Sequence, residues 1–235
     1  MQSDLSLLAE KMGGPLYYNS SPEHNTQLLA YSTDASVYQE KPLAVAIPEN
    51  TDDIKLLIGF ARQHQVTLIP RAAGTSLAGQ VVGNGIVVDI SRHFNEVIEI
   101  NTAEKWVRVQ PGVIRDDLNR KLAPHGLMFG PETSTANRAM IGGMVGNNSC
   151  GLHSIVWGAV RDHLLEVTAI LSDGSDAVFK EEPVDANHYT GLKKDIYAGI
   201  QQLLGDDTRQ ALIKKQFPKA AVVRRNTGYA LDSMV

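Results

Sequence analysis

Hydrophobic residues in the first ninety positions follow two different periods. Positions 5–12 carry apolar side chains at helical spacing, and the glycine–glycine–proline run at 13–15 predicts the end of that helix. Apolar positions within 54–61, behind a capping Asn50 or Thr51, predict a second helix. Continuous apolar runs predict buried strands at 43–47, 66–69 and 86–90. The order strand, helix, strand, strand indicates a small α/β lobe.

In the rest of the chain, hairpins alternate with amphipathic helices. Paired β-like runs predict hairpins at 97–100 with 106–110 and at 166–171 with 177–179. Helical spacing predicts a helix over 114–122, ending near Gly126, and another over 192–204. Residues 130–158 are rich in glycine, asparagine and other small side chains and show little periodicity. Long segments of that kind inside compact domains are generally functional.

The most informative connection is the glycine-containing loop 70–80, between the second and third predicted strands. Its small residues leave backbone N–H groups uncovered, and Gly74 and Gly79 tolerate positive φ, so the chain can curl into an anion-binding nest. The hydroxyls of Thr75 and Ser76 add neutral donors. The loop therefore favours a site for the pyrophosphate of a dinucleotide. The alternative, from these residues alone, is a flexible connection between two strands.

Two common phosphate motifs are excluded at this loop. A Walker A loop needs Gly-Lys followed by Ser or Thr, whereas Gly79 is followed by Gln80 and Val81. The Gly-x-Gly-x-x-Gly fingerprint that opens a helix does not occur in the sequence either. Because an apolar, β-branched run follows Gly79, we expect the phosphates to be held without a helix dipole.

Composition narrows the class of protein. With 235 residues, 43% hydrophobic and 20% charged, the chain can bury a sizeable core, and its net charge of −4 gives no electrostatic footprint for nucleic acid. No apolar stretch approaches the roughly 20 residues of a membrane span, and the N-terminus does not read as a secretory signal. The single Cys150 excludes an intrachain disulfide and a cysteine-cluster metal site. We expect a cytoplasmic protein with no metal site, no nucleic-acid partner and no membrane span.

Blocks at four places in the chain carry a family resemblance: 70–76, 130–134, 141–151 and 157–163. In this order they resemble the FAD-binding domain of the vanillyl-alcohol oxidase/p-cresol methylhydroxylase (PCMH-type) flavoproteins, over roughly residues 41–179. Within that family the chain is most similar to FAD-linked 2-hydroxy-acid dehydrogenases of the D-lactate/glycolate type, especially long members with an iron–sulfur module. The ending 225–232 resembles the segment that leads to the substrate domain there.

The resemblance implies an α+β fold, a PCMH-type FAD-binding domain of two α/β subdomains with the cofactor between them. On that basis residues 1–40 are an N-terminal helix and lead-in segment, and 41–90 form the first FAD-binding subdomain. Residues 91–217 form the second subdomain with late helices, and 218–235 begin the connection to a missing substrate domain.

The resemblance also assigns cofactor contacts. Residues of the first loop would hold the pyrophosphate: Pro70, Arg71, Ala72, Ala73, Gly74, Thr75, Ser76, Gly79 and Gln80. Those of the second block would approach the flavin: Pro131, Glu132, Thr133 and Ser134. Close passage of the chain is implied at Ile141, Gly142 and Gly143, and the same wall continues through Asn147, Asn148 and Gly151. Residues bordering the adenosine half would be Gly158, Val160 and Ile170.

Several assignments stay open at this stage. Arg71 and Arg161 offer charge either to phosphates or to ion pairs within the domain. Thr75 stands where some family members carry a histidine that bonds to the flavin, so the resemblance implies non-covalent FAD, and Cys150 is read as a buried thiol beside the pocket. For His153 a structural role is favoured over a catalytic one, as it is for His163, and no catalytic residue is assigned. Arg225, Asn226 and Tyr229 stand near the end of the chain without an assigned role.

The implied activity is oxidation of a 2-hydroxy acid by hydride transfer to flavin N5, with the electrons passed to a further acceptor. In that family the substrate cap lies C-terminal to this domain, so we expect FAD binding but little turnover by the chain alone. An iron–sulfur cluster would belong to missing C-terminal regions only. The alternatives are a reductase that takes hydride from NADPH, and a non-catalytic module that has lost its cofactor.

Overall fold

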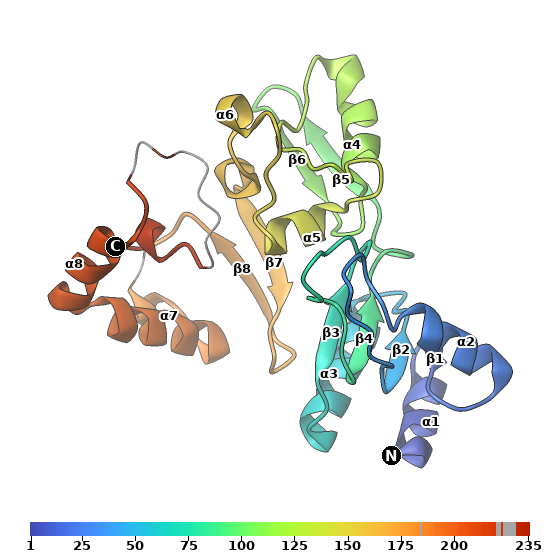
Figure 1. Cartoon of the computed structure of the whole chain (residues 1–235). Helices are drawn as coiled ribbons and strands as arrows, with labels where there is room; N and C mark the ends of the chain where they lie inside the picture. Colours follow the sequence, from blue (N-terminus) through green and yellow to red (C-terminus); the bar gives the residue numbers. More distant parts are fainter. Residues whose placement is uncertain (184, 220–221, 223–228) are drawn as a thin grey trace.

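The computed structural model describes residues 1–183, 185–219, 222 and 229–235. It contains two α/β lobes, followed by a long hairpin that carries the last helices (Figure 1). Arg225 and Asn226 lie outside the described residues, so the structure says nothing of their placement.

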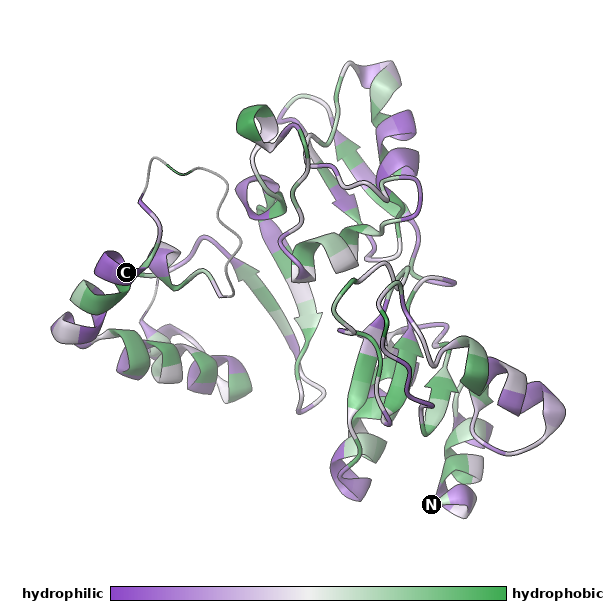
Figure 2. Ribbon diagram, viewed as in Figure 1, coloured by the Kyte–Doolittle hydropathy of each residue, from purple (hydrophilic) through white to green (hydrophobic). Residues whose placement is uncertain are grey.

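The first lobe is built on a sheet with the strand order β1–β2–β4–β3. Its strands are β1 (Leu16–Tyr17), β2 (Ala44–Ala46), β3 (Leu68–Arg71) and β4 (Ile86–Asp89). The last three are parallel to one another, and β1 pairs antiparallel with β2. Every residue of β2 and β4 is buried, which is why these strands read as continuous apolar runs (Figure 2).

Three helices accompany this sheet: α1 (Gln2–Lys11), α2 (Pro22–Ala30) and α3 (Thr51–His64). The Asn50 side chain accepts hydrogen bonds from the N–H groups of Asp52 and Asp53, so the predicted cap of α3 is confirmed. Leu5 of α1 and Leu57 of α3 are fully buried in one core with the central strands. Residues 1–40, read from the sequence as a lead-in, therefore help to form the core of the first lobe.

The second lobe contains the predicted hairpin β5 (Val97–Asn101) and β6 (Trp106–Val109), packed against α4 (Arg115–Leu122). A 3-10 turn continues α4 to Gly126, which takes the left-handed conformation at φ 66°, close to the predicted end. The glycine-rich segment 130–158 holds two short helices that the sequence does not predict, α5 (Ile141–Gly146) and α6 (Ser154–Trp157).

The second predicted hairpin is present as β7 (Glu166–Ile170) and β8 (Asp176–Lys180). Its turn reaches α3 of the first lobe, where Lys55 Nζ lies 2.7 Å from Asp176 Oδ2 and Arg62 donates to the Asp173 carbonyl at 3.3 Å. Beyond it come α7 (Gly191–Leu204) and α8 (Asp207–Gln216). No helix in the described ranges combines the length and apolarity needed to cross a bilayer.

Lys193 fastens α7 to the hairpin. Its ammonium group lies 2.7 Å from Glu182 Oε1, donates to the Val178 carbonyl at 2.5 Å, and stands 4.4 Å from the centre of the Tyr189 ring. Tyr197 donates to the same carboxylate at 2.6 Å. These two hydrogen bonds, from Lys193 and Tyr197, hold the pKa of Glu182 below its ordinary value.

Low pH should weaken the attachment of α7 to the β7–β8 hairpin. Because the pKa of Glu182 is lowered in the folded state, its contribution to stability is present at neutral pH and is lost as pH falls below the ordinary Glu value of about 4.3. We expect Glu182→Gln to lower the urea midpoint at pH 7 and to make a smaller difference at pH 3, because the contribution of the ionised carboxylate falls as the pH drops below the ordinary Glu value. A midpoint difference that is the same at both pH values would contradict this.

Candidate functional site

The first glycine loop leaves the sheet at the carboxyl end of β3. Pro70 and Arg71 still belong to that strand and pair with Val88 and Asp89 of β4. The chain then runs through the loop and a turn directly into β4, with no helix in between. The predicted succession of loop and strand is thus present, and that the phosphates are held without a helix dipole stays a prediction.

The backbone of this loop is rich in unused donors. Among the described residues, none accepts a hydrogen bond from the N–H groups of residues 72–77. Residues 72–76 are half-buried, so these donors are only partly open to water. Gly74 and Gly79 have φ values of 65° and 73°, and Gln80 N–H closes the loop on Ser76 Oγ at 3.3 Å. Such a row of inward-curled, unpaired donors is the geometry that binds a phosphate.

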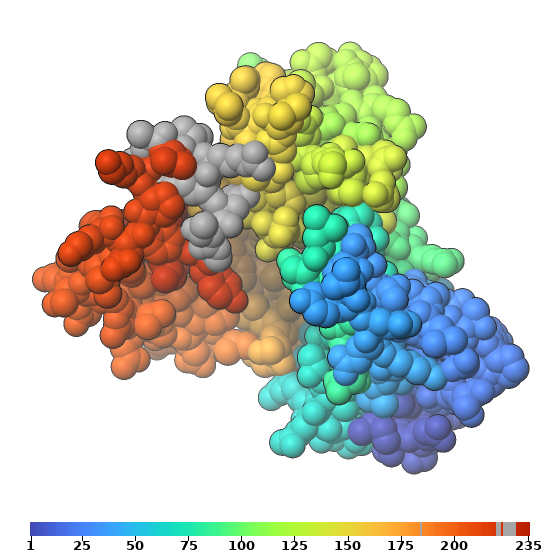
Figure 3. All heavy atoms as spheres, in the orientation of Figure 1, coloured from blue at the N-terminus to red at the C-terminus, as the bar shows by residue number. Residues whose placement is uncertain are grey.

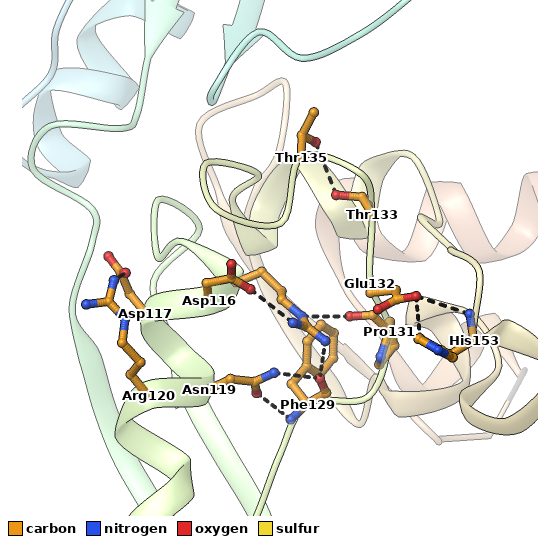
Figure 4. Close-up of polar contacts among 11 residues, drawn as sticks. Asp116, Asp117, Asn119, Arg120, Phe129, Pro131, Glu132, Thr133, Thr135 and His153 are labelled. Carbon is orange, nitrogen blue, oxygen red and sulfur yellow. Dashed lines mark hydrogen bonds and ion pairs between the residues drawn. The ribbon is translucent and has the colours of Figure 1, made fainter.

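Hydrogen bonds from α4 hold the start of the second block, residues 130–134, and the residue before it. Asn119 both donates to the Phe129 carbonyl at 3.1 Å and accepts from its N–H at 2.7 Å (Figure 4). Arg115 donates to the carbonyls of Phe129 and Pro131 at 3.3 and 3.1 Å. The carbonyls of Phe129 and Pro131 are thus bound by α4. The next residues, 132–134, have N–H groups that donate to no described acceptor.

Glu132 ties this block to the segment that precedes α6. One carboxylate oxygen accepts from the His153 N–H at 3.1 Å and lies 2.7 Å from His153 Nδ1 (Figure 4). A Cβ on Gly151 would stand 2.6 Å from the Glu132 carbonyl oxygen, so only glycine allows this approach. The predicted residues Glu132 and Gly151 are therefore brought together, and His153 is bonded to Glu132 within the chain.

Helix α5 brings the two lobes into contact. Gly142 donates to the Pro111 carbonyl at 2.8 Å, and a Cβ on Gly142 would stand 2.5 Å from the Pro111 Cβ. A Cβ on Gly143 would lie 3.4 Å from the Ala72 Cβ, which places the start of α5 against the start of the first loop. The predicted loop and the predicted close passage at 141–143 thus lie side by side.

The other residues predicted to contact the cofactor are buried, bonded within the chain or located at the ends of helices and strands. Val160 is 2% exposed and packs in the core with Met144, and its N–H donates to the Ser149 carbonyl at 3.1 Å, so neither its side chain nor its N–H is open to a ligand. Asn148, at φ 45°, accepts from the Arg161 N–H at 3.0 Å. Other predicted positions lie at the ends of elements, with Asn147 after α5, Gly158 after α6 and Ile170 at the end of β7.

Some side chains considered in the sequence are already committed within the chain. The Arg71 guanidinium donates to the Thr33 carbonyl at 2.7 Å, and Arg161 Nε lies 4.0 Å from Asp162. His163 Nε2 is 2.6 Å from the Trp157 carbonyl oxygen. Cys150 is half-buried, and Tyr229 is 86% exposed. No three metal-binding side chains gather anywhere in the described ranges.

Sequence reasoning missed two supports of the site. The 31–38 segment contacts the first loop, and the polar face of α4 clamps the second block. Arg115 and Asn119 stand between the apolar positions that predict α4, so their polar character carried the only available signal.

Unpaired backbone donors on two adjoining α/β lobes are an arrangement suited to binding a dinucleotide. Solved structures are similar to about three quarters of this chain in fold. Wild-type Physcomitrella patens BBE-like 1 gives a TM-score of 0.64 at 23% identity, over 77% of this chain and 39% of that one. The 6-hydroxy-D-nicotine oxidase of Arthrobacter nicotinovorans gives 0.63 at 22% identity, over 74% and 38%.

Sequence comparison specifies the family. A family model described as an FAD binding domain matches residues 42–176, so the chain belongs to that family, with the PCMH-type α+β fold. The chain is 41% identical over 209 residues to a D-2-hydroxyglutarate dehydrogenase of Pseudomonas putida, covering 85% of this chain and 20% of that protein. Glycolate oxidase subunit GlcD of Bacillus subtilis is 34% identical over 166 residues, covering 70% and 35%. The chain thus spans about a fifth of the dehydrogenases it matches.

Proposed function

We propose that this chain is the FAD-binding part of a flavoprotein oxidoreductase that oxidises a 2-hydroxy acid. The observation that carries the proposal is the row of unpaired N–H groups at 72–77, beside the glycine helix α5. The family and the names of the relatives, D-2-hydroxyglutarate dehydrogenase and glycolate oxidase subunit GlcD, support the same reading. Bound FAD would supply the capacity to accept a hydride from the carbon that bears the hydroxyl.

The residues of this chain fit that cofactor. A pyrophosphate carries negative charge, and half-buried N–H groups without a protein acceptor satisfy it while gaining the partners they lack. Gly142 and Gly143 let α5 approach Pro111 and Ala72 closely, which brings this helix next to the loop. Residues 132–134 offer further donors opposite, held in place by Glu132 and α4.

Attachment is proposed to be non-covalent. The position in the first loop that would carry a linking histidine is Thr75, whose hydroxyl can only donate or accept a hydrogen bond. Flavin affinity would then depend on the backbone donors of the loop.

The substrate and the acceptor are proposed to bind elsewhere in a longer assembly. The relatives extend well beyond the region that this chain matches, so contacts to the acid's carboxylate and any iron–sulfur cluster are assigned to such further regions. A cytoplasmic location is proposed on the composition, and cell fractionation tests it.

A titration with FAD tests the proposal. We expect saturable binding of one FAD per chain, seen as a shift of the flavin absorbance, and release of the flavin into the supernatant on acid precipitation. Flavin that stays with the precipitate would contradict non-covalent attachment. A chain that takes up no FAD would indicate the non-catalytic module instead.

Reduction of the bound flavin distinguishes a 2-hydroxy-acid dehydrogenase from a reductase that uses NADPH. Under anaerobic conditions we expect D-lactate, glycolate or D-2-hydroxyglutarate to bleach the isolated chain slowly at most, because substrate contacts lie outside it. Rapid bleaching by NADPH would indicate a reductase. Rapid turnover with a hydroxy acid would show that this chain already holds the substrate site.

A further inference from the structure

A segment of the N-terminal region lies directly against the first glycine loop. This segment, residues 31–38, follows α2 and covers the loop at both of its positive-φ glycines (Figure 3). Ala35 donates its N–H to the Gly74 carbonyl at 3.1 Å. At the other end, a Cβ on Gly79 would stand 2.8 Å from Cδ2 of Tyr38. The two points that set the curl of the loop are therefore both in contact with this segment.

Arg71 joins the segment to the loop. Its guanidinium donates through Nη1 to the Thr33 carbonyl at 2.7 Å and stands 5.1 Å from the centre of the Tyr31 ring. Its Nη2 would lie 2.6 Å from a Cβ on Gly74. The guanidinium thus fills the space beneath Gly74 and is held there by a carbonyl and an aromatic face, both from the 31–38 segment.

Tyr31 is itself fixed from the sheet. Its hydroxyl donates to Asp89 Oδ2, and Asp89 is 4% exposed and accepts from the Ser91 N–H at 2.7 Å with its other oxygen. Burial and the neighbouring carboxylate raise the pKa of Tyr31, so the hydroxyl stays a donor at all physiological pH values. Asp89 pairs with Arg71 across the β3–β4 ladder, so the ring and the guanidinium are both positioned by the end of the sheet.

We propose that Arg71 is a positioning residue for FAD rather than a phosphate ligand: held by Thr33 and Tyr31, its guanidinium props Gly74 from below and keeps the N–H groups of 72–77 turned toward the pyrophosphate. The inference rests on the proposed FAD function of the loop. It differs from the direct contact that an arginine beside a phosphate loop suggests, because this guanidinium already binds partners within the chain.

A double-mutant cycle on FAD affinity tests it. Arg71→Met and Tyr31→Leu are each expected to raise the Kd for FAD by about tenfold, and the double variant by hardly more than either alone, because both changes release the same loop. Effects that multiply would mean that Arg71 and Tyr31 act independently of each other, which would contradict their shared hold on the loop. Arg120→Met, on an exposed side chain of α4, is the control for removing a positive charge and should leave the Kd unchanged.

Arg71→Lys supplies a second readout that needs no change at Tyr31. A lysine keeps the charge but has no planar fork to bond Thr33 while covering the Tyr31 ring, so it should not restore affinity. The salt dependence of the Kd should also match wild type in Arg71→Met, since no phosphate contact is lost.

The outcomes separate cleanly. Full rescue by lysine, a flattened salt dependence, or multiplicative effects in the cycle would each overturn the positioning role while leaving the FAD site intact. A wild-type chain that does not bind FAD would overturn the proposed function and this inference with it. If Tyr31→Leu does not fold, as judged by circular dichroism, the lysine and salt readouts decide the question.

Discussion

Replacing Asp53 by alanine is expected to lower the free energy of unfolding of the FAD-free chain by about 1–3 kcal/mol, because the buried N–H of Gly14 loses its acceptor. The Asp53 side chain is 3% exposed and accepts three backbone hydrogen bonds, from the N–H groups of Gly13, Gly14 and Glu49, at 2.8, 3.1 and 2.9 Å. One carboxylate therefore joins the turn after α1 to the turn after β2.

Relaxation cannot easily satisfy these donors in another way. A Cβ on Gly14 would stand 1.9 Å from the Ile47 carbonyl oxygen, so this turn already lies as close to its neighbour as backbone atoms allow. Asp52→Ala is the matched control, because Asp52 is exposed in the same helical turn, and its loss should change stability by less than about 0.5 kcal/mol. Urea unfolding of both variants makes the comparison, and equal midpoints would refute the bridging role of Asp53.

The sequence predicts best where burial is complete and local. The strands β2 and β4 are buried on both faces, so they stand out as apolar runs without any knowledge of their neighbours. Helix α3 is predicted for the same reason, since its cap at Asn50 and its apolar stripe lie within one short window. The Gly74 and Gly79 conformations also follow from residue type, because positive φ is cheap for glycine alone.

What the sequence could not predict depends on partners far along the chain. Helix α5 is short and contains glycine at three of its positions, and it is held by bonds from Ile141 and Gly142 to carbonyls of Val113 and Pro111. No helical periodicity reveals such an element. The sequence likewise left two roles open for Arg71, a phosphate contact or an ion pair within the domain. Its partner Thr33 lies in a segment with no recognisable motif.

The residues predicted to contact FAD divide in the same way. The backbone donors of the first loop could be expected from small residues alone, whereas the burial of Val160 needs the packing of Met144, which only the fold supplies. The contact between Gly143 and Ala72 joins two blocks that the sequence presents separately. The family motifs thus predict which backbone would face the cofactor, and the structure shows what holds that backbone in place.

Gly74→Val is expected to weaken FAD binding by about five- to thirtyfold, because the left-handed conformation costs a side-chain-bearing residue about 1–2 kcal/mol and each 1.4 kcal/mol is tenfold in affinity. Gly74 has φ 65°, which a β-branched residue resists most strongly. The new Cβ would also stand 2.6 Å from Nη2 and 2.9 Å from Cζ of Arg71. Both effects push the loop out of the curl that aligns residues 72–77. Titration of the folded variant with FAD, followed by flavin fluorescence, measures the loss.

Gly174→Val separates the loss of FAD affinity from general backbone strain. Gly174 has φ 85° and open space around its Cβ position, at the turn of the β7–β8 hairpin. The same substitution there should lower the melting temperature by a similar amount and leave the Kd for FAD near the wild-type value. If Gly174→Val weakens FAD binding as much as Gly74→Val does, the loop has no special role and the affinity simply follows overall stability. A loss of FAD affinity in Gly74→Val alone would indicate that the backbone N–H groups of residues 72–77 bind the negatively charged phosphates of the cofactor. The substitution at Gly74 itself removes no side-chain donor.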